Sequence, residues 1–62
     1  MDLADTNVRL FSRIEAAYFL GITPYKFTLY ARPVLPVFNI GGRELFAETD
    51  LREYLDSVRV SP

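Results

Sequence analysis

The sequence contains no cysteine, no histidine and no tryptophan among its 62 residues. Without cysteine or histidine the chain has no disulfide, no thiol nucleophile and none of the commonest zinc ligands. Its longest apolar run, 16–20, is far shorter than the roughly 18 residues that a membrane-spanning helix needs. No basic leader precedes an apolar stretch, so a secretory signal is not expected either. We therefore expect no metal, no cofactor and no membrane contact, and a place in the cytoplasm.

The short length limits the chain to one domain, which buries about 60% of the surface that its unfolded form exposes. Hydrophobic residues make up 50% of the sequence and aromatic residues 15%, enough for a small packed core. Such a core does not wall off a catalytic pocket, so we expect a binding module and not an enzyme. The expected parts are a flexible N-terminal tail, a folded domain and a C-terminal tail, with bounds at 1–7, 8–58 and 59–62.

Two helices joined by a tight turn are predicted near the start of the domain. Ser12 and Glu15 have the spacing of a capping box, and Gly21 ends the helix that this box begins. Thr23 and Pro24 then suit the cap and the first position of a second helix. Two helices separated by about three residues that include glycine are typical of a helix-turn-helix.

The apolar spacing predicts which side chains form the core. In the second helix Phe27, Tyr30 and Ala31 fall at helical spacing and are expected to face inward. Four aromatic residues are assigned to packing: Tyr18, Phe19, Tyr30 and Tyr54.

A β-hairpin is predicted around Gly41-Gly42, followed by a last helix. A two-residue turn pairs Phe38 with Leu45, whereas a three-residue loop pairs Phe38 with Phe46. We favour the longer loop, because it places Phe38, Ile40 and Phe46 on one face. The last helix is expected to begin with Thr49 as its cap and Asp50 at the positive end of its dipole. Its predicted apolar face comprises Leu51, Tyr54, Leu55 and Val58.

The stretch from Phe11 to Leu55 resembles the excisionase family of small, MerR-like winged helix-turn-helix DNA-binding domains. The resemblance rests on Glu15-Ala16-Ala17, Leu20-Gly21-Ile22-Thr23, Leu35-Pro36, Ile40-Gly41-Gly42-Arg43 with Phe46, and Thr49-Asp50-Leu51 with Tyr54-Leu55. It implies an α+β fold with three helices and a two-stranded wing. It also implies that the second helix enters the major groove of double-stranded DNA, while the wing reaches the backbone or minor groove.

The same resemblance implies a biological role. Excisionases are recombination directionality factors that bind phage attachment DNA cooperatively, bend it, and steer an integrase toward excision. The expected partners are therefore DNA, an integrase, and further copies of this chain in head-to-tail contact, inside a bacterial cell. Two alternatives remain: a phage transcriptional regulator or DNA-recognition module of the same fold, and a protein-interaction adaptor without DNA binding.

The net charge of −1 is unevenly spread along the chain. Between Leu20 and Phe46 three cations face one carboxylate, Glu44, which leaves +2. The remaining residues carry four arginines against seven acids, which leaves −3. The predicted reading surface is thus modestly basic, and a single protomer is expected to bind DNA weakly and with strong salt dependence. Contacts between neighbouring protomers would compensate by avidity.

The candidate DNA-binding residues lie on the second helix and the hairpin. They are Thr23, Pro24, Tyr25, Lys26, Thr28, Leu29, Arg32, Asn39, Gly41, Gly42 and Arg43. Arg43 at the hairpin tip is the strongest candidate for a phosphate or minor-groove contact, and its alternative is an ordinary solvated turn arginine. Lys26 suits a phosphate contact, while Arg32 suits either a phosphate or the carbonyl end of its own helix. Leu29 suits a thymine methyl, the turn at Pro33 or another protomer.

The acidic residues of the last helix are interpreted differently. Glu48, Asp50, Glu53 and Asp56 are expected to complement the helix dipole and to keep the surface solvated. They could also meet basic residues of a neighbouring protomer, with Arg9, Arg13 and Arg59 as the candidates.

Overall fold

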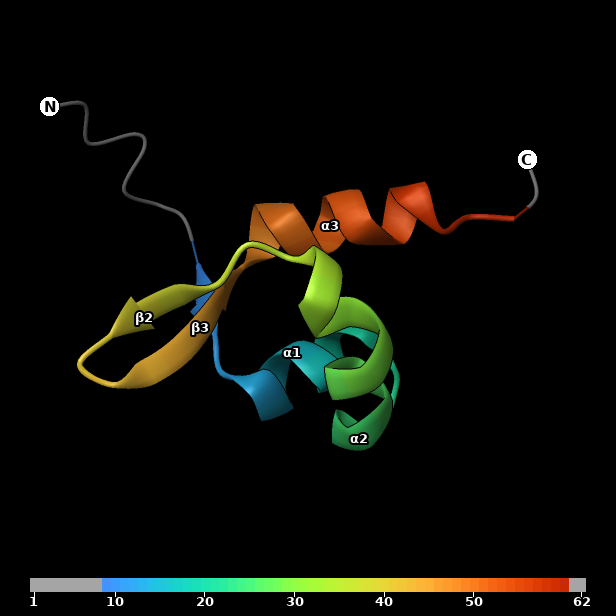
Figure 1. Ribbon diagram of the computed structural model, residues 1–62. Helices are drawn as coiled ribbons and strands as arrows, with labels where there is room; N and C mark the ends of the chain where they lie inside the picture. Colours follow the sequence, from blue (N-terminus) through green and yellow to red (C-terminus); the bar gives the residue numbers. More distant parts are fainter. Residues whose placement is uncertain (1–8, 61–62) are drawn as a thin grey trace, which may run out of the picture.

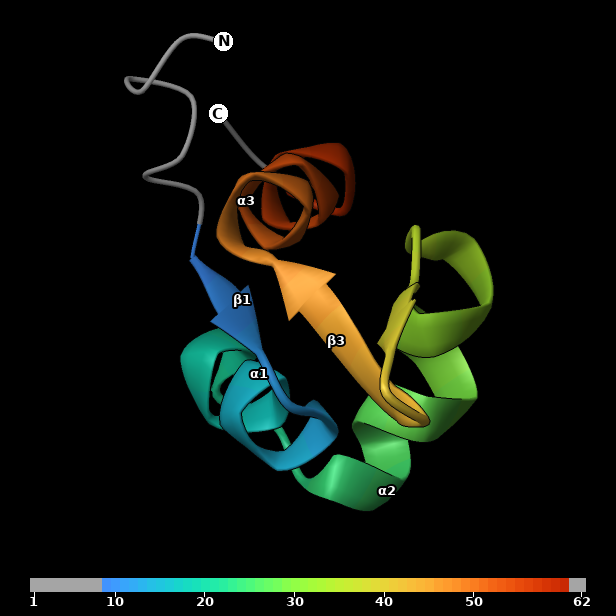
Figure 2. The same cartoon turned by 90° about the vertical axis from the view of Figure 1, so that its left-hand side faces the viewer.

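Helices surround a short antiparallel sheet whose strands lie in the order β1-β3-β2 in this computed structural model, which describes residues 9–60 (Figures 1 and 2). The elements are β1 (Leu10–Phe11), α1 (Arg13–Leu20), α2 (Pro24–Lys26), η2 (Phe27–Ala31), η3 (Arg32–Val34), β2 (Phe38–Ile40), β3 (Arg43–Ala47) and α3 (Glu48–Ser57). The predicted α+β class is confirmed, but the sheet has a third strand because the segment before α1 pairs with β3. The predicted tail at 1–7 and the last two residues of the tail at 59–62 lie outside the described residues.

The predicted start and end of the first helix and the predicted start of the second are confirmed. The Ser12 hydroxyl accepts the Glu15 N–H at 3.2 Å, and the Glu15 carboxylate accepts the Ser12 N–H at 2.9 Å. Gly21 ends α1 with a φ of 78°, a left-handed conformation that glycine adopts without a steric cost. Thr23 caps α2 by accepting the Lys26 N–H at 3.1 Å, and Pro24 takes the first helical position. These local interactions set the turn between the helices.

The second helical segment does not continue as a regular α-helix. After α2 it widens into the π-helical turn η2, in which the Arg32 N–H donates to the Phe27 carbonyl, and then tightens into the 3-10 turn η3. Phe27 and Ala31 are fully buried as predicted, but the prediction for Tyr30 is wrong, because its side chain is 64% exposed. A π turn contains more residues than an α turn, so Tyr30, three residues after Phe27, is not rotated far enough to face the core.

The core lies between α1, η2, β3 and α3. Its largest fully buried side chains are Phe27, Phe46 and Leu51, and two alanines of α1 allow the close approach of these elements. The rings of Phe27 and Phe46 meet edge to face, with centroids 4.9 Å apart. Of the other aromatic residues assigned to packing, Phe19 and Tyr54 do lie against the core. The assignment of Tyr18 is wrong, since that side chain is 76% exposed.

The hairpin has the register that the sequence interpretation placed second. Ile40 pairs with Arg43 and Phe38 with Leu45 across a two-residue turn, so the predicted three-residue loop is wrong. Gly41 and Gly42 have φ values of 60° and 84°, and positive φ at both positions gives the turn whose twist matches that of the strands. As a result Phe46 faces the core, while Phe38 and Ile40 lie on the opposite face and remain about half exposed.

Helix α3 begins two residues earlier than predicted. Its cap position is Ala47, not Thr49, and the first helical residue is Glu48, whose N–H donates to the Arg9 carbonyl at 2.8 Å. That bond exists because β1 runs beside β3, so a backbone group distant in sequence replaces the side-chain cap. The predicted apolar face is also narrower than expected, because Leu55 and Val58 are 41% and 49% exposed.

Candidate nucleic-acid interface

The predicted site residues gather on two neighbouring parts of the surface, the start of the second helical segment and the hairpin. Figure 1 shows the hairpin projecting beyond the helices, while α3 lies on the side of the molecule away from α2. Figure 2, which looks toward the hairpin tip, shows the same separation of α3 from α2. The helix and the hairpin thus share one side of the molecule, and α3 occupies another.

The side chains on α2 and η2 divide into free and engaged groups. Tyr25 and Lys26 are exposed, and within residues 9–60 neither makes a side-chain hydrogen bond or ion pair. Thr28 is engaged: its hydroxyl donates to the Pro24 carbonyl at 3.1 Å and accepts from Arg13 at 3.5 Å. Leu29 is 47% exposed and lies outside the buried cluster. Tyr25 and Lys26 are therefore the α2 side chains available to a ligand.

The hairpin presents Arg43 beside its glycine turn. This side chain is exposed and has no ion-pair partner within residues 9–60. Asn39 on β2, the other polar candidate of the hairpin, is also exposed. The φ values of Gly41 and Gly42 hold Arg43 directly opposite Ile40, near the tip of the hairpin. A guanidinium in this position can approach a phosphate with few neighbouring side chains in its way.

Arg32 bonds to Glu44 and not to the carbonyl end of its own helix, while its phosphate contact stays a prediction. Its guanidinium donates two hydrogen bonds to the Glu44 carboxylate, at 3.0 and 2.5 Å, which ties the end of η2 to the hairpin. Both side chains are 39% exposed. The hydrogen bond from Arg32 holds the pKa of Glu44 below its ordinary value, and the neighbouring charge of Arg13 lowers this pKa further. The pair therefore positions the hairpin against the second helical segment.

The sequence interpretation missed Arg13, which it treated as part of the flanks. Arg13 donates to the Pro24 carbonyl and to the Thr28 hydroxyl, both at 3.5 Å, so it lies against the start of α2. A hollow of about 350 Å³ also brings Arg13 together with Arg43 and Glu44. No local pattern marks this arginine, because the contacts join residues 11 and 15 positions apart.

Arg13 raises the positive charge of the predicted surface. Four cations now face one carboxylate, Glu44, for a net charge of +3: Arg13, Lys26, Arg32 and Arg43. Helix α3, by contrast, carries four acids and one arginine. The near-neutral chain is therefore polarised, with a cationic surface along α2 and the hairpin and an acidic helix elsewhere.

The residues described in the structure contain no cluster of three or more side chains suited to a metal ion and no helix long and apolar enough to cross a membrane. Comparison with family models, with curated proteins and with solved structures finds no match to this chain.

Replacing Glu44 by glutamine is expected to remove a pH-dependent part of the stability. Because folding lowers the pKa of Glu44 below its unfolded value of about 4.3, the stabilisation is fully present above that value. It is lost as the pH falls through the lower pKa of the folded state. The difference in unfolding free energy between wild type and Glu44→Gln should thus be constant from neutral pH to about 5 and shrink as the pH falls further. Urea unfolding across this pH range measures it, and a pH-independent difference would contradict the ion pair.

Proposed function

We propose that this protein is a winged helix-turn-helix DNA-binding protein that acts architecturally, as an excisionase or recombination directionality factor. The observation that carries the proposal is the hollow that brings Arg13, which lies against the start of α2, together with Arg43 of the hairpin, away from the acidic helix α3. The exposed Lys26 of α2 adds a third cation. Phosphate contacts from such cations position a protein on DNA and supply most of its non-specific affinity. The specific role in excision rests on the sequence resemblance alone.

In the proposed mechanism α2 and η2 dock in the major groove, where Tyr25, Thr28 and Leu29 face the base edges and backbone. The wing, which is the β2–β3 hairpin, brings Arg43 to the flanking backbone or minor groove. Further copies assemble head to tail along attachment-site DNA, and an integrase completes the complex. The protein performs no covalent chemistry in this scheme.

The test is a gel-shift titration of duplex DNA from the cognate attachment region at several salt concentrations between about 50 and 200 mM. With the three free or weakly bonded cations on phosphates, the plot of log K against log salt should have a slope of about −3. Lys26→Ala and Arg43→Ala should each weaken binding and reduce the magnitude of the slope by about 1. A footprint that extends in steps as protein is added would support cooperative assembly.

The matched control is Arg52→Ala, which removes the same charge from α3, on a side chain that is 66% exposed and has no role in the proposed surface or in the proposed contacts between protomers. It should leave both affinity and slope close to those of wild type. Unchanged binding by Lys26→Ala and Arg43→Ala would overturn the proposed surface. No DNA binding by wild type even at about 50 mM salt would favour the adaptor function instead, and a fixed, non-spreading footprint would favour a transcriptional regulator.

A further inference from the structure

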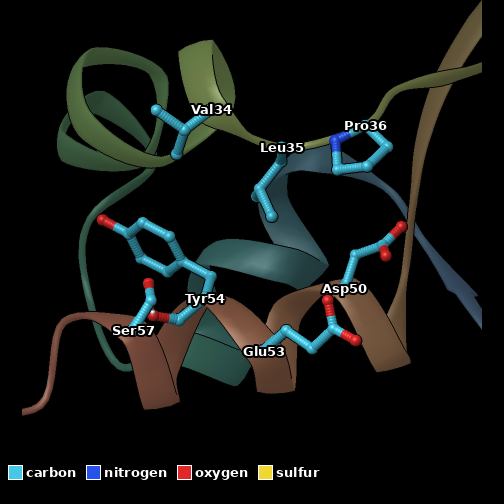
Figure 3. Close-up of a pocket in the computed structure, with 7 residues that line it drawn as sticks. All are labelled: Val34, Leu35, Pro36, Asp50, Glu53, Tyr54 and Ser57. Carbon is cyan, nitrogen blue, oxygen red and sulfur yellow. Dashed lines mark hydrogen bonds between the residues drawn. The ribbon is translucent and has the colours of Figure 1, made fainter.

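A groove of about 370 Å³ separates α3 from the segment that leaves η3 (Figure 3). Its lining residues are Val34, Leu35, Pro36, Asp50, Glu53, Tyr54 and Ser57. The groove lies along α3, which Figures 1 and 2 place away from α2. None of its lining residues belongs to the cationic surface described above, so the groove can be occupied while that surface is engaged.

Two carboxylates on the rim of this groove are unpaired. Within residues 9–60 the other carboxylates all have a partner: Glu15 caps α1, Glu44 pairs with Arg32, Glu48 with Arg52, and Asp56 with Arg59. Asp50 and Glu53 make no hydrogen bond or ion pair in the same range, and Figure 3 shows both beside the groove. Asp50 lies in the first turn of α3 and complements its dipole, but Glu53 lies beyond that turn.

The groove also has an aromatic side and an apolar floor. Leu35 forms the floor and is 8% exposed, whereas Val34 above it is 66% exposed. The half-buried Tyr54 ring stands on α3 and points toward Val34 in Figure 3. Its hydroxyl has no hydrogen-bond partner within the described residues. Figure 3 thus shows the two carboxylates toward one end of the hollow, and the Tyr54 ring with Val34 toward the other.

We infer that this groove is a docking site for an arginine side chain of a partner protein, carried on a segment that has apolar residues on either side of the arginine. A guanidinium binds a carboxylate with two parallel hydrogen bonds, which a lysine ammonium does not do. The carboxylates of Asp50 and Glu53 offer this interaction at their end of the groove. Leu35, Val34 and the Tyr54 ring then receive the flanking apolar side chains. This inference is independent of DNA binding.

The chemistry of this chain favours a different protein over a second copy. Arg13, Arg32, Arg52 and Arg59 are already hydrogen-bonded or paired, and Arg9 stacks over the Phe11 ring. The remaining arginine of the chain, Arg43, belongs to the cationic surface. An arginine of a second copy would therefore reach this groove only by breaking one of these contacts or by withdrawing Arg43 from the cationic surface.

The test uses the full-length, nitrogen-15-labelled protein and the capped peptide acetyl-Ala-Leu-Arg-Leu-Ala-amide, followed by NMR. The expected result is saturable binding, with amide shifts confined to Val34, Leu35 and α3. The same peptide with citrulline in place of arginine keeps the shape and loses the charge. It should bind at least about tenfold more weakly, because charged hydrogen bonds are lost. Equal binding of the two peptides, or no binding of either, would overturn the inference.

Variants of the acidic residues complete the test. The double variant Asp50→Asn with Glu53→Gln should weaken binding of the arginine peptide to the level of the citrulline peptide. Asp56→Asn is the matched control, since it removes a carboxylate from the same helix outside the groove, and it should bind like wild type. If the resonances of the groove instead shift when the protein alone is diluted, a second copy fills the groove and the inference is wrong.

Discussion

Replacement of Phe27 by alanine is expected to unfold most of the protein at room temperature. The side chain is fully buried, and its ring packs edge to face on Phe46 between η2 and the sheet. Removing a buried phenylalanine costs about 3–5 kcal/mol, the sum of the lost transfer free energy and the cavity left behind. A 62-residue domain has a total stability of about 3–9 kcal/mol, so this loss removes from about a third of it to all of it.

Tyr30→Ala is the matched control for this substitution. It removes a ring of similar size from the same helical segment, but one that is 64% exposed. Its expected cost is within about 0.5 kcal/mol, as for a surface substitution. Urea unfolding followed by circular dichroism measures both variants. Equal costs for Phe27→Ala and Tyr30→Ala would mean that η2 presents a different face to the core, as regular helical spacing predicts.

The double substitution Gly41→Val and Gly42→Val is expected to destabilise the protein by about 2–4 kcal/mol. Both positions have positive φ, and each L-residue held there costs about 1–2 kcal/mol. A side-chain carbon added at either position meets no atom within 4 Å, so the cost arises from the backbone alone. The chain can avoid it only by abandoning the two-residue turn, which would displace Arg43 from its place opposite Ile40.

Gly41→Asn separates conformational strain from any effect of adding a side chain. Asn-Gly is a favoured pair for a hairpin turn with positive φ at both positions. This variant should therefore retain wild-type stability within about 0.5 kcal/mol, as well as wild-type DNA binding. The valine double variant should lose the part of the salt dependence assigned to Arg43. Wild-type urea unfolding and DNA binding by the double variant would show that the turn has another geometry.

The polarised surface changes the meaning of the small net charge. The net charge of −1 is the sum of +3 on the cationic surface and the negative charge of α3 and the flanks. Arg13 joins the cationic surface only through contacts across the fold, whereas Glu44 neutralises Arg32 within it. The charge that a ligand meets is thus set by which side chains pair in the folded state, and the sum over the chain does not report it.

Local interactions explain what the sequence by itself determined. The capping box of Ser12 and Glu15, the left-handed end at Gly21 and the cap at Thr23 each involve residues within a few positions of one another. Their energies depend on backbone geometry that the segment adopts by itself, so spacing alone predicts them. The α+β class follows in the same way from two helical patterns and a glycine hairpin.

The tertiary structure decided the features that depend on distant neighbours. The contact of Phe46 with Phe27 selects the hairpin register. The Arg9 carbonyl, just before the added strand β1, fixes the start of α3. The exposure of Tyr30 and the placement of Arg13 beside α2 depend likewise on how the second helical segment packs. Side-chain patterns along the chain record which residues are apolar or charged. Only packing determines which of them become buried, paired or free, because those outcomes depend on partners far away in the sequence.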